Sequence, residues 1–152
     1  MKVLFVCRGN VARSQIAEAF FNHYCTSTAC SAGIQVNRAG NTLSNEGKLV
    51  KSGIDIMLEY GIDISGNVRK QLIPEMVNQA DQVVVMVKPD LIPEYLKTES
   101  KITFWDIDDP REMTAEGWAQ IVTSIRIQVL EFIKEHKLQA RAASGSNSVC
   151  GE

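Results

Sequence analysis

Short apolar runs alternate with amphipathic segments along this chain of 152 residues. Four runs rich in aliphatic and β-branched side chains are predicted to form strands, at residues 2–7, 28–34, 82–87 and 102–107. The run at 82–87 is apolar throughout rather than alternating, which is typical of a central parallel strand covered on both faces. We therefore expect a sheet whose core strands are buried from both sides.

Segments with apolar side chains at helical spacing lie between and after these runs. The clearest is a long helix that Thr114 would cap, in which apolar side chains from Trp118 to Ile133 recur every three or four residues. The other predicted helices are one that carries Ile16, Phe20 and Tyr24, one that begins near Ser44 or Asn45 and ends at Gly61, residues 67–80 with a break at Pro74, and a short helix at 89–97.

The alternation of strands and helices favours a three-layer α/β/α fold with a central four-stranded parallel sheet. Residues 1–138 are expected to form one such domain, because the chain's length and its apolar content of 45% suffice for a single buried core. From Gln139 onward the chain is rich in Ala, Ser, Gly and Asn, so residues 139–152 are expected to be a flexible tail.

The charge and the length of the apolar runs exclude several classes of partner. Sixteen basic and eighteen acidic residues give a net charge of −2, so we expect no general attraction to nucleic acid or to a membrane surface. No apolar run is long enough for a membrane span or a secretion signal, which makes the cytoplasm the expected location. An anion that this protein binds must therefore be bound locally.

The four cysteines are too few for a disulfide-rich scaffold and include no CxxC pair. We therefore expect reduced thiols, and neither a metal site nor a cofactor. Cys25 and Cys30 are expected in the core, where free cysteines are commonly buried, and Cys150 is expected on the tail.

The residues from Cys7 to Ser14, CRGNVARS, lie between the first predicted strand and the first predicted helix, where they would form a phosphate-binding loop. Backbone N–H groups at a helix N-terminus attract anions and equally stabilise a thiolate, so Cys7 is predicted to be a nucleophile. Arg13 would hold two oxygens of a tetrahedral oxyanion in a fork. Gly9 and Asn10 tolerate the positive φ angles of a closed loop, and Ser14 could hydrogen-bond the thiolate. The residues expected to bind the substrate are Arg8, Gly9, Asn10, Val11, Ala12 and Ser14.

An acidic segment, from Asp106 to Asp109, follows the fourth predicted strand and so reaches the same edge of the sheet. A phosphomonoester needs a proton at its leaving oxygen, which a protonated carboxylic acid can supply. Crowding among Asp106, Asp108 and Asp109 would keep at least one of them protonated. Asp109 and Asp108 are therefore both candidates for the general acid.

The segment from Val6 to Ala17, VCRGNVARSQIA, resembles the phosphate-binding loop of the low-molecular-weight protein tyrosine phosphatase family, and the similarity continues in residues 31–33, in residues 60–65 and in Asp109-Pro110. The resemblance implies that Cys7 is the nucleophile, that Arg13 binds the phosphoryl group and that Asp109 is the general acid. It implies hydrolysis of phosphomonoesters on a protein or a small molecule, through a cysteinyl phosphate. Phosphate or another tetrahedral oxyanion would then be a product or an inhibitor.

Three positions differ from the family pattern. Ala12 stands where the family has a second loop cysteine, so a protective disulfide with the nucleophile cannot form. Residues 111–113 are Arg-Glu-Met, where family members commonly carry tyrosines that wall an aryl pocket, and Gly66-Asn67 replaces a histidine that often supports the loop. The change at residues 111–113 leaves open whether protein phosphotyrosine is the substrate. The change at residues 66–67 and the added cation of Arg8 beside the nucleophile affect the rigidity of the loop and its preference for more anionic ligands.

Arsenate reduction is the alternative within the same fold, because arsenate is tetrahedral like phosphate. Reductases with this loop that couple to thioredoxin need a further cysteine pair after the third strand, and residues 82–100 contain no cysteine. A reductase that uses an external small thiol stays open. A non-catalytic anion-binding module is a second alternative, although anion binding alone needs neither a thiol nor a proton donor.

Overall fold

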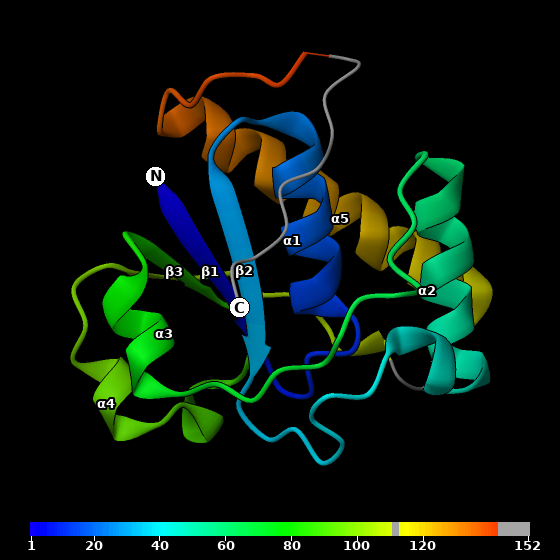
Figure 1. The fold of residues 1–152 in the computed structure, drawn as a ribbon, viewed down its shortest axis with the longest axis horizontal. Coiled ribbons are helices and arrows are strands. Elements are labelled where there is room, and N and C mark those ends of the chain that lie inside the picture. The colour runs from blue at the N-terminus through cyan, green and yellow to red at the C-terminus, as the bar shows by residue number, and fades with distance from the viewer. Residues whose placement is uncertain (111–112, 143–152) are drawn as a thin grey trace.

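The computed structural model describes residues 1–110 and 113–142. The sheet at its centre has four parallel strands, which are β1 (Lys2–Cys7), β2 (Thr28–Gly33), β3 (Gln82–Val85) and β4 (Ile102–Phe104). Their order is β2-β1-β3-β4 (Figure 1). All four strands lie within the runs that the sequence pattern predicted.

Helices cover both faces of the sheet, so the three-layer α/β/α class expected from the sequence is confirmed. The first layer contains α1 (Arg13–Tyr24) and α5 (Ala115–Glu135), with α2 (Lys48–Glu59) packed against α5. The opposite layer contains α3 (Pro74–Gln79) and α4 (Glu94–Lys97) (Figure 1).

The central strand β1 divides the core into two halves. Val3 and Phe5 pack into the cluster that includes side chains of α1, α2 and α5, whereas Leu4 and Val6 pack into the cluster beside α3 and α4. Successive side chains of a strand point to opposite faces, so β1 needs apolar residues at each buried position from Val3 onward. This burial from both sides explains why apolar and polar residues do not alternate along β1 and β3.

The carboxyl end of β1 lies where the strand order changes direction. From β1 the chain passes through α1 to β2 on one side, and it later forms β3 and β4 on the other side. Ligands of open parallel sheets bind at such a crevice, outside the carboxyl ends of the strands. The loop that follows Cys7 occupies this position.

The segment 67–73 is extended, which corrects the helix predicted for residues 67–80. Only the second half of that prediction is helical, in α3, where Pro74 occupies an initial position that requires no N–H partner. In the extended half, Val68 forms a β-bridge with Thr42 and Gln71 forms one with Gly33. Pairing with distant backbone therefore overrides the local helical pattern.

The ends of the longer helices follow their capping residues. The predicted start of α2 at Ser44 or Asn45 is wrong, because these residues belong to a 3-10 turn, η1 (Leu43–Asn45), and the helix starts after Gly47, whose φ is 90°. Gly61, with a φ of 79°, follows the end of α2 as predicted. Thr114 caps α5 as predicted, since its hydroxyl accepts a hydrogen bond from the Gly117 N–H at 3.2 Å.

The first residues of the expected tail are hydrogen-bonded to the end of α1 and the turn after it. The Gln139 carbonyl accepts from the Thr26 N–H at 3.0 Å, and the Arg141 N–H donates to the Tyr24 carbonyl at 2.9 Å. Residues 139–141 are thus anchored rather than free, and the domain boundary after residue 138 stays a prediction. Residues 143–152, including Cys150, lie outside the described part of the chain.

The described cysteines are buried, as the sequence predicted for Cys25 and Cys30. Cys7 and Cys25 are free thiols. Cys30 is disulfide-bonded, which corrects the expectation of a reduced thiol at that position.

Candidate active site

The loop between β1 and α1 depends on a close approach to the end of β2. A Cβ atom at Gly33 would lie 2.7 Å from the Asn10 nitrogen and 2.8 Å from the Arg8 carbonyl oxygen. Real Cβ atoms do not approach backbone atoms this closely, so only glycine fits here. Gly33 therefore allows the loop to fold back against β2.

The Cys7 thiol is buried at the start of this loop, with its sulfur 2.9 Å from the Ser14 hydroxyl oxygen. The same oxygen accepts a hydrogen bond from Asn10 Nδ2 at 2.8 Å. Because the Asn10 amide already donates to this oxygen, the single hydroxyl hydrogen of Ser14 is available to the sulfur. The contact predicted between Ser14 and Cys7 is confirmed, and it suits a sulfur that carries negative charge.

Asn10 holds the loop in a left-handed turn, as predicted. Its φ is 52°, and its side chain is completely buried. Its amide oxygen accepts hydrogen bonds from the Lys70 N–H at 2.8 Å and from Gln15 Nε2 at 3.1 Å. Its Nδ2 also donates to the Ser31 hydroxyl at 3.0 Å. The side chain thus satisfies several groups that the loop would otherwise leave buried without partners.

Gln15 is a residue of this site that the sequence analysis missed. It lies in the first turn of α1 with its side chain fully buried. Its Nε2 lies 3.1 Å from Asn10 Oδ1, 3.4 Å from the Asn10 carbonyl oxygen and 3.1 Å from the Val68 carbonyl oxygen. Its Oε1 accepts from Asn67 Nδ2 at 3.3 Å. Gln15 therefore joins the loop to the extended segment 67–73.

Arg13 is positioned by groups that follow two other strands. Its Nη1 donates to the carbonyl oxygens of Met86 and Ile107, the second at 3.2 Å, and its Nη2 lies 3.6 Å from Asp109 Oδ2. β3 ends at Val85 and β4 at Phe104, earlier than the predicted Val87 and Ile107, and both carbonyls lie beyond these ends. Arg13 thereby spans the carboxyl edge of the sheet.

Arg69 and Glu46 brace the other side of the loop, and the sequence analysis missed both. Arg69 donates to the Gly9 carbonyl oxygen from Nη2 at 2.8 Å and from Nε at 3.1 Å, and to Glu46 Oε1 at 3.0 Å. A Cβ at Gly9 would lie only 3.3 Å from Arg69 Nη2. The φ of Gly9 is not positive, which corrects the prediction, and the small residue instead admits the guanidinium group.

Two carboxyl groups near the loop have shifted pKa values. Burial raises the pKa of Glu46, but hydrogen bonds from Asn41 and Arg69 together outweigh burial, so the pKa is lowered overall. Beneath the loop, burial raises the pKa of Glu18, and the opposing effects of Lys70 and of the Ser31 hydroxyl are smaller. Glu46 is therefore ionised at neutral pH and balances part of the charge of Arg69.

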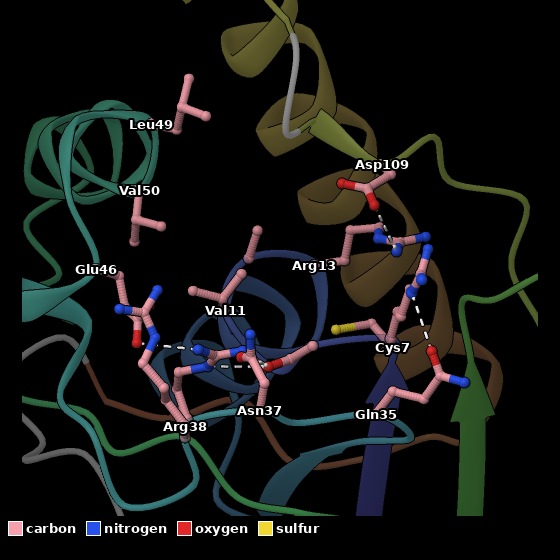
Figure 2. Close-up of a pocket in the computed structure, with 14 residues that line it drawn as sticks. Cys7, Val11, Arg13, Gln35, Asn37, Arg38, Glu46, Leu49, Val50 and Asp109 are labelled. Carbon is pink, nitrogen blue, oxygen red and sulfur yellow. Dashed lines mark hydrogen bonds and ion pairs between the residues drawn. The ribbon is translucent and has the colours of Figure 1, made fainter.

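A cavity of about 490 Å³ opens beside Cys7. The three predicted catalytic residues, Cys7, Arg13 and Asp109, all line it (Figure 2). Of the predicted substrate-binding residues, Arg8, Gly9, Val11 and Ala12 line it as well. Asn10 and Ser14 do not line the cavity, because their side chains are fully buried behind the loop. The prediction that these two side chains contact the substrate is therefore corrected, and they support the loop instead.

The structure separates the two candidate acids. Asp109 is 32% exposed in its side chain and lines the cavity of Cys7, where Figure 2 shows its carboxylate turned towards Arg13. Asp106 and Asp108 line only a neighbouring cavity, which Asp109 and Arg13 also border. Asp109 is therefore better placed than Asp108 to protonate a group bound at Cys7.

The described residues, 1–110 and 113–142, contain no cluster of three or more His, Cys, Asp or Glu side chains that could hold a metal ion. Within the same residues, no helix combines the length and the apolar character that a membrane span requires.

The sequence profile of the family described as low molecular weight phosphotyrosine protein phosphatase matches residues 2–142. The chain belongs to this family. Among the relatives of this chain, the arsenate reductase of Shouchella clausii (strain KSM-K16) is 33% identical to it over 122 residues, which are 76% of each protein. The family resemblance inferred from the loop is thus confirmed.

Solved structures of the family carry both names. The low molecular weight protein tyrosine phosphatase from T. tengcongensis is 29% identical, covers 89% of this chain and 99% of its own, and has a TM-score of 0.74. An arsenate reductase in the phosphate-binding state is 25% identical, covers 88% of this chain and 97% of its own, and has a TM-score of 0.68. The family is enzymatic, and both reactions occur among proteins similar to this one.

Proposed function

We propose that this protein is a cysteine-dependent phosphatase that hydrolyses phosphomonoesters without a metal ion. The observation that carries the proposal is that Cys7, Arg13 and Asp109 line one cavity, with Arg13 3.6 Å from Asp109. Binding of an anion needs no proton donor, but expulsion of an alcohol or a phenol does. The position of Asp109 therefore supports hydrolysis over anion binding alone.

In the first step, the Cys7 thiolate attacks phosphorus in line with the leaving oxygen. The S–P bond forms as the P–O bond breaks, and Asp109 gives its proton to the departing oxygen. Arg13 and the N–H groups of the loop stabilise the charge on the three equatorial oxygens. The products of this step are an alcohol or phenol and a cysteinyl phosphate.

In the second step, water attacks the phosphorus of the intermediate while Asp109 accepts a proton from that water. The S–P bond breaks, phosphate leaves, and the Cys7 thiolate is restored beside the Ser14 hydroxyl at 2.9 Å. Because phosphate occupies the same loop as the substrate, phosphate and similar tetrahedral oxyanions are expected to inhibit competitively.

Hydrolysis of p-nitrophenyl phosphate tests this proposal. Cys7→Ser should abolish turnover, since a serine hydroxyl is a far weaker nucleophile than a thiolate. Cys25→Ser is the matched control, because Cys25 is also a free, buried thiol but does not line the cavity. Turnover that survives Cys7→Ser would refute the mechanism, and wild-type protein that hydrolyses no phosphomonoester would refute the function.

Arsenate reduction with an external thiol is a second candidate, and the walls of the cavity favour it. No described lining residue is aromatic, and beyond the loop the walls include Gln35, Asn37 and Arg38, which suit a small oxyanion. The Cys7 thiolate would displace water from arsenate, and an external thiol would then attack the Cys7 sulfur. This attack forms a mixed disulfide and releases arsenite with the electron pair of the S–As bond.

Arsenate-dependent oxidation of glutathione, with glutaredoxin present to reduce the mixed disulfide, measures this reaction. Its kcat/KM should be compared with that for p-nitrophenyl phosphate in the same preparation. Reduction that is faster than hydrolysis and is lost in Cys7→Ser would favour the reductase. Hydrolysis without any arsenate-dependent oxidation would exclude it.

A further inference from the structure

Positive charge is concentrated in the cavity beside Cys7, although the whole chain carries a net charge of −2. Among the residues that the structure describes, two carboxylates line the cavity, those of Glu46 and Asp109. Four guanidinium groups of the same described residues line it, those of Arg8, Arg13, Arg38 and Arg69.

Arg13 and Arg69 are parts of the loop's own construction. Their side chains are 9% and 6% exposed, respectively. Arg13 donates to two backbone carbonyls beyond the ends of β3 and β4, and Arg69 donates to the Gly9 carbonyl and to Glu46. These two arginines therefore hold the phosphate loop in place.

Arg8 and Arg38 are not needed to hold the loop. Arg8 Nε donates to Gln35 Oε1 at 3.3 Å, and Arg8 forms no ion pair with any residue in the described part of the chain. Arg38 is 60% exposed and lies 3.1 Å from Glu46, a carboxylate that also pairs with Arg69. Since a guanidinium group has five N–H donors, both side chains keep donors for a ligand.

The remaining walls offer little that would hold an aromatic leaving group. The apolar side chains that line the cavity are Val11, Ala12, Leu49 and Val50, and none of the described lining residues is aromatic. A leaving group bound here would gain more from a planar guanidinium group, which binds carboxylate or phosphate with two parallel hydrogen bonds, than from stacking.

We propose that Arg8 and Arg38, which line the same cavity as the phosphate loop and contact different partners, provide an anion subsite in which either arginine can hold a second anion, and that the substrates are small phosphomonoesters whose leaving group carries such an anionic group, either carboxylate or phosphate. The inference rests on the proposed hydrolysis, because it names the substrate class for the same cavity. Arg8 lines the same cavity as Cys7, so a group bound to it shares this cavity with the phosphoryl group. A cavity of about 490 Å³ accommodates a small molecule of this kind.

Two aryl phosphates test the subsite, 4-carboxyphenyl phosphate and the methyl ester of the same compound. The wild-type protein should have the higher kcat/KM for the carboxylate, and added salt should reduce this preference by screening. Arg8→Gln should lower the ratio of the two kcat/KM values about fivefold, which corresponds to about 1 kcal/mol for a solvent-exposed ion pair. Comparing ratios between variants cancels the different acidities of the two phenols.

Arg38→Gln should lower the ratio in the same direction, and the double variant should lower it further. Lys97→Gln is the matched control, because it removes a cation from α4 that does not line the cavity. A ratio that stays at the wild-type value in both arginine variants would overturn the subsite. Cys7-dependent hydrolysis would in that case leave the proposed function intact.

The subsite can also be tested without turnover. Calorimetric binding of both compounds to the Cys7→Ser protein should show tighter binding of the carboxylate, and Arg8→Gln should remove the difference. Equal affinities would overturn the subsite even if the wild-type protein hydrolyses neither compound. A phosphotyrosine peptide with acidic neighbours that is hydrolysed better than 4-carboxyphenyl phosphate would overturn the small-molecule assignment.

Discussion

Replacement of Gln15 by glutamate would exchange the amide that supports the phosphate loop for a carboxyl group of nearly the same size. Gln15 Nε2 faces three oxygen acceptors, the Asn10 side-chain and carbonyl oxygens and the Val68 carbonyl oxygen, at distances between 3.1 and 3.4 Å. A carboxylate has no hydrogen to donate, so it would face these acceptors with the same sign of partial charge. The variant should therefore loosen the loop at Asn10.

The size of this effect follows from the burial of the groups involved. Two donated hydrogen bonds are lost, and each loss costs about 0.5–1.5 kcal/mol, because Asn10 Oδ1 and the Val68 carbonyl oxygen keep a second donor in Lys70, which gives about 1–3 kcal/mol in total. Burial also raises the pKa of the introduced carboxyl group in the folded state. A protonated carboxyl group still donates one hydrogen bond, so the part of the penalty that depends on pH is absent below the ordinary pKa of glutamate and grows as the pH rises towards the raised folded-state value.

Urea unfolding of the wild type, Gln15→Glu and Gln15→Met between about pH 4.5 and pH 8 measures this dependence. The deficit of Gln15→Glu should shrink by about 1 kcal/mol or more as the pH falls, through the one recovered hydrogen bond. Gln15→Met, which has similar length and no charge, should show a constant deficit. The rate of Cys7 alkylation by iodoacetate measures the reactivity of the sulfur directly. A deficit of Gln15→Glu that does not depend on pH would refute the reasoning.

Three further substitutions test the site. Asp109→Asn should slow hydrolysis of phenyl phosphate by about 10²-fold or more and that of p-nitrophenyl phosphate by less, because the better leaving group needs less protonation; equal slowing would place the acid elsewhere. Arg13→Lys keeps the charge but loses the fork, so calorimetry should show phosphate affinity reduced about tenfold, and an unchanged affinity would contradict that role. Glu46 has a lowered pKa in the folded state, so the stability it contributes is present above its ordinary pKa and is lost as the pH falls. Glu46→Gln should therefore flatten the acid side of the stability curve in urea unfolding, and an acid side identical to that of the wild type would contradict this.

The elements predicted correctly are those whose signals are local. The apolar run at 82–87 and the periodicity after Thr114 reflect burial of one segment, so they are visible without knowledge of the rest of the chain. The segment 67–73 was predicted incorrectly, because its extended form depends on pairing with Thr42 and Gly33, far away in the sequence. The order of the strands is likewise a property of pairing and could not be predicted from the runs.

The residues of the candidate site divide in the same way, into those with a local signal in the sequence and those that depend on distant contacts. Cys7, Arg13 and Ser14 lie in one contiguous loop, so their spacing alone predicted a nucleophile beside an anion site. Gln15 and Arg69 act through backbone carbonyls of segments more than fifty residues away, with separations of 53 and 60 positions. A glutamine in a first helical turn and an arginine in a polar stretch are typical of exposed surface, so nothing local distinguishes them.

The contacts of Arg13 couple occupancy of the loop to the persistence of the fold. Its guanidinium group binds carbonyls beyond the ends of two strands, so an oxyanion held by Arg13 and by the loop after β1 connects three strand ends at once. A ligand that binds only the folded state stabilises it by about 1.4 kcal/mol for each tenfold rise in concentration above its Kd. We therefore expect the resistance of this protein to proteolysis to rise and fall with the concentration of free phosphate, which would make the turnover of the chain itself responsive to the anion that the proposed hydrolysis releases.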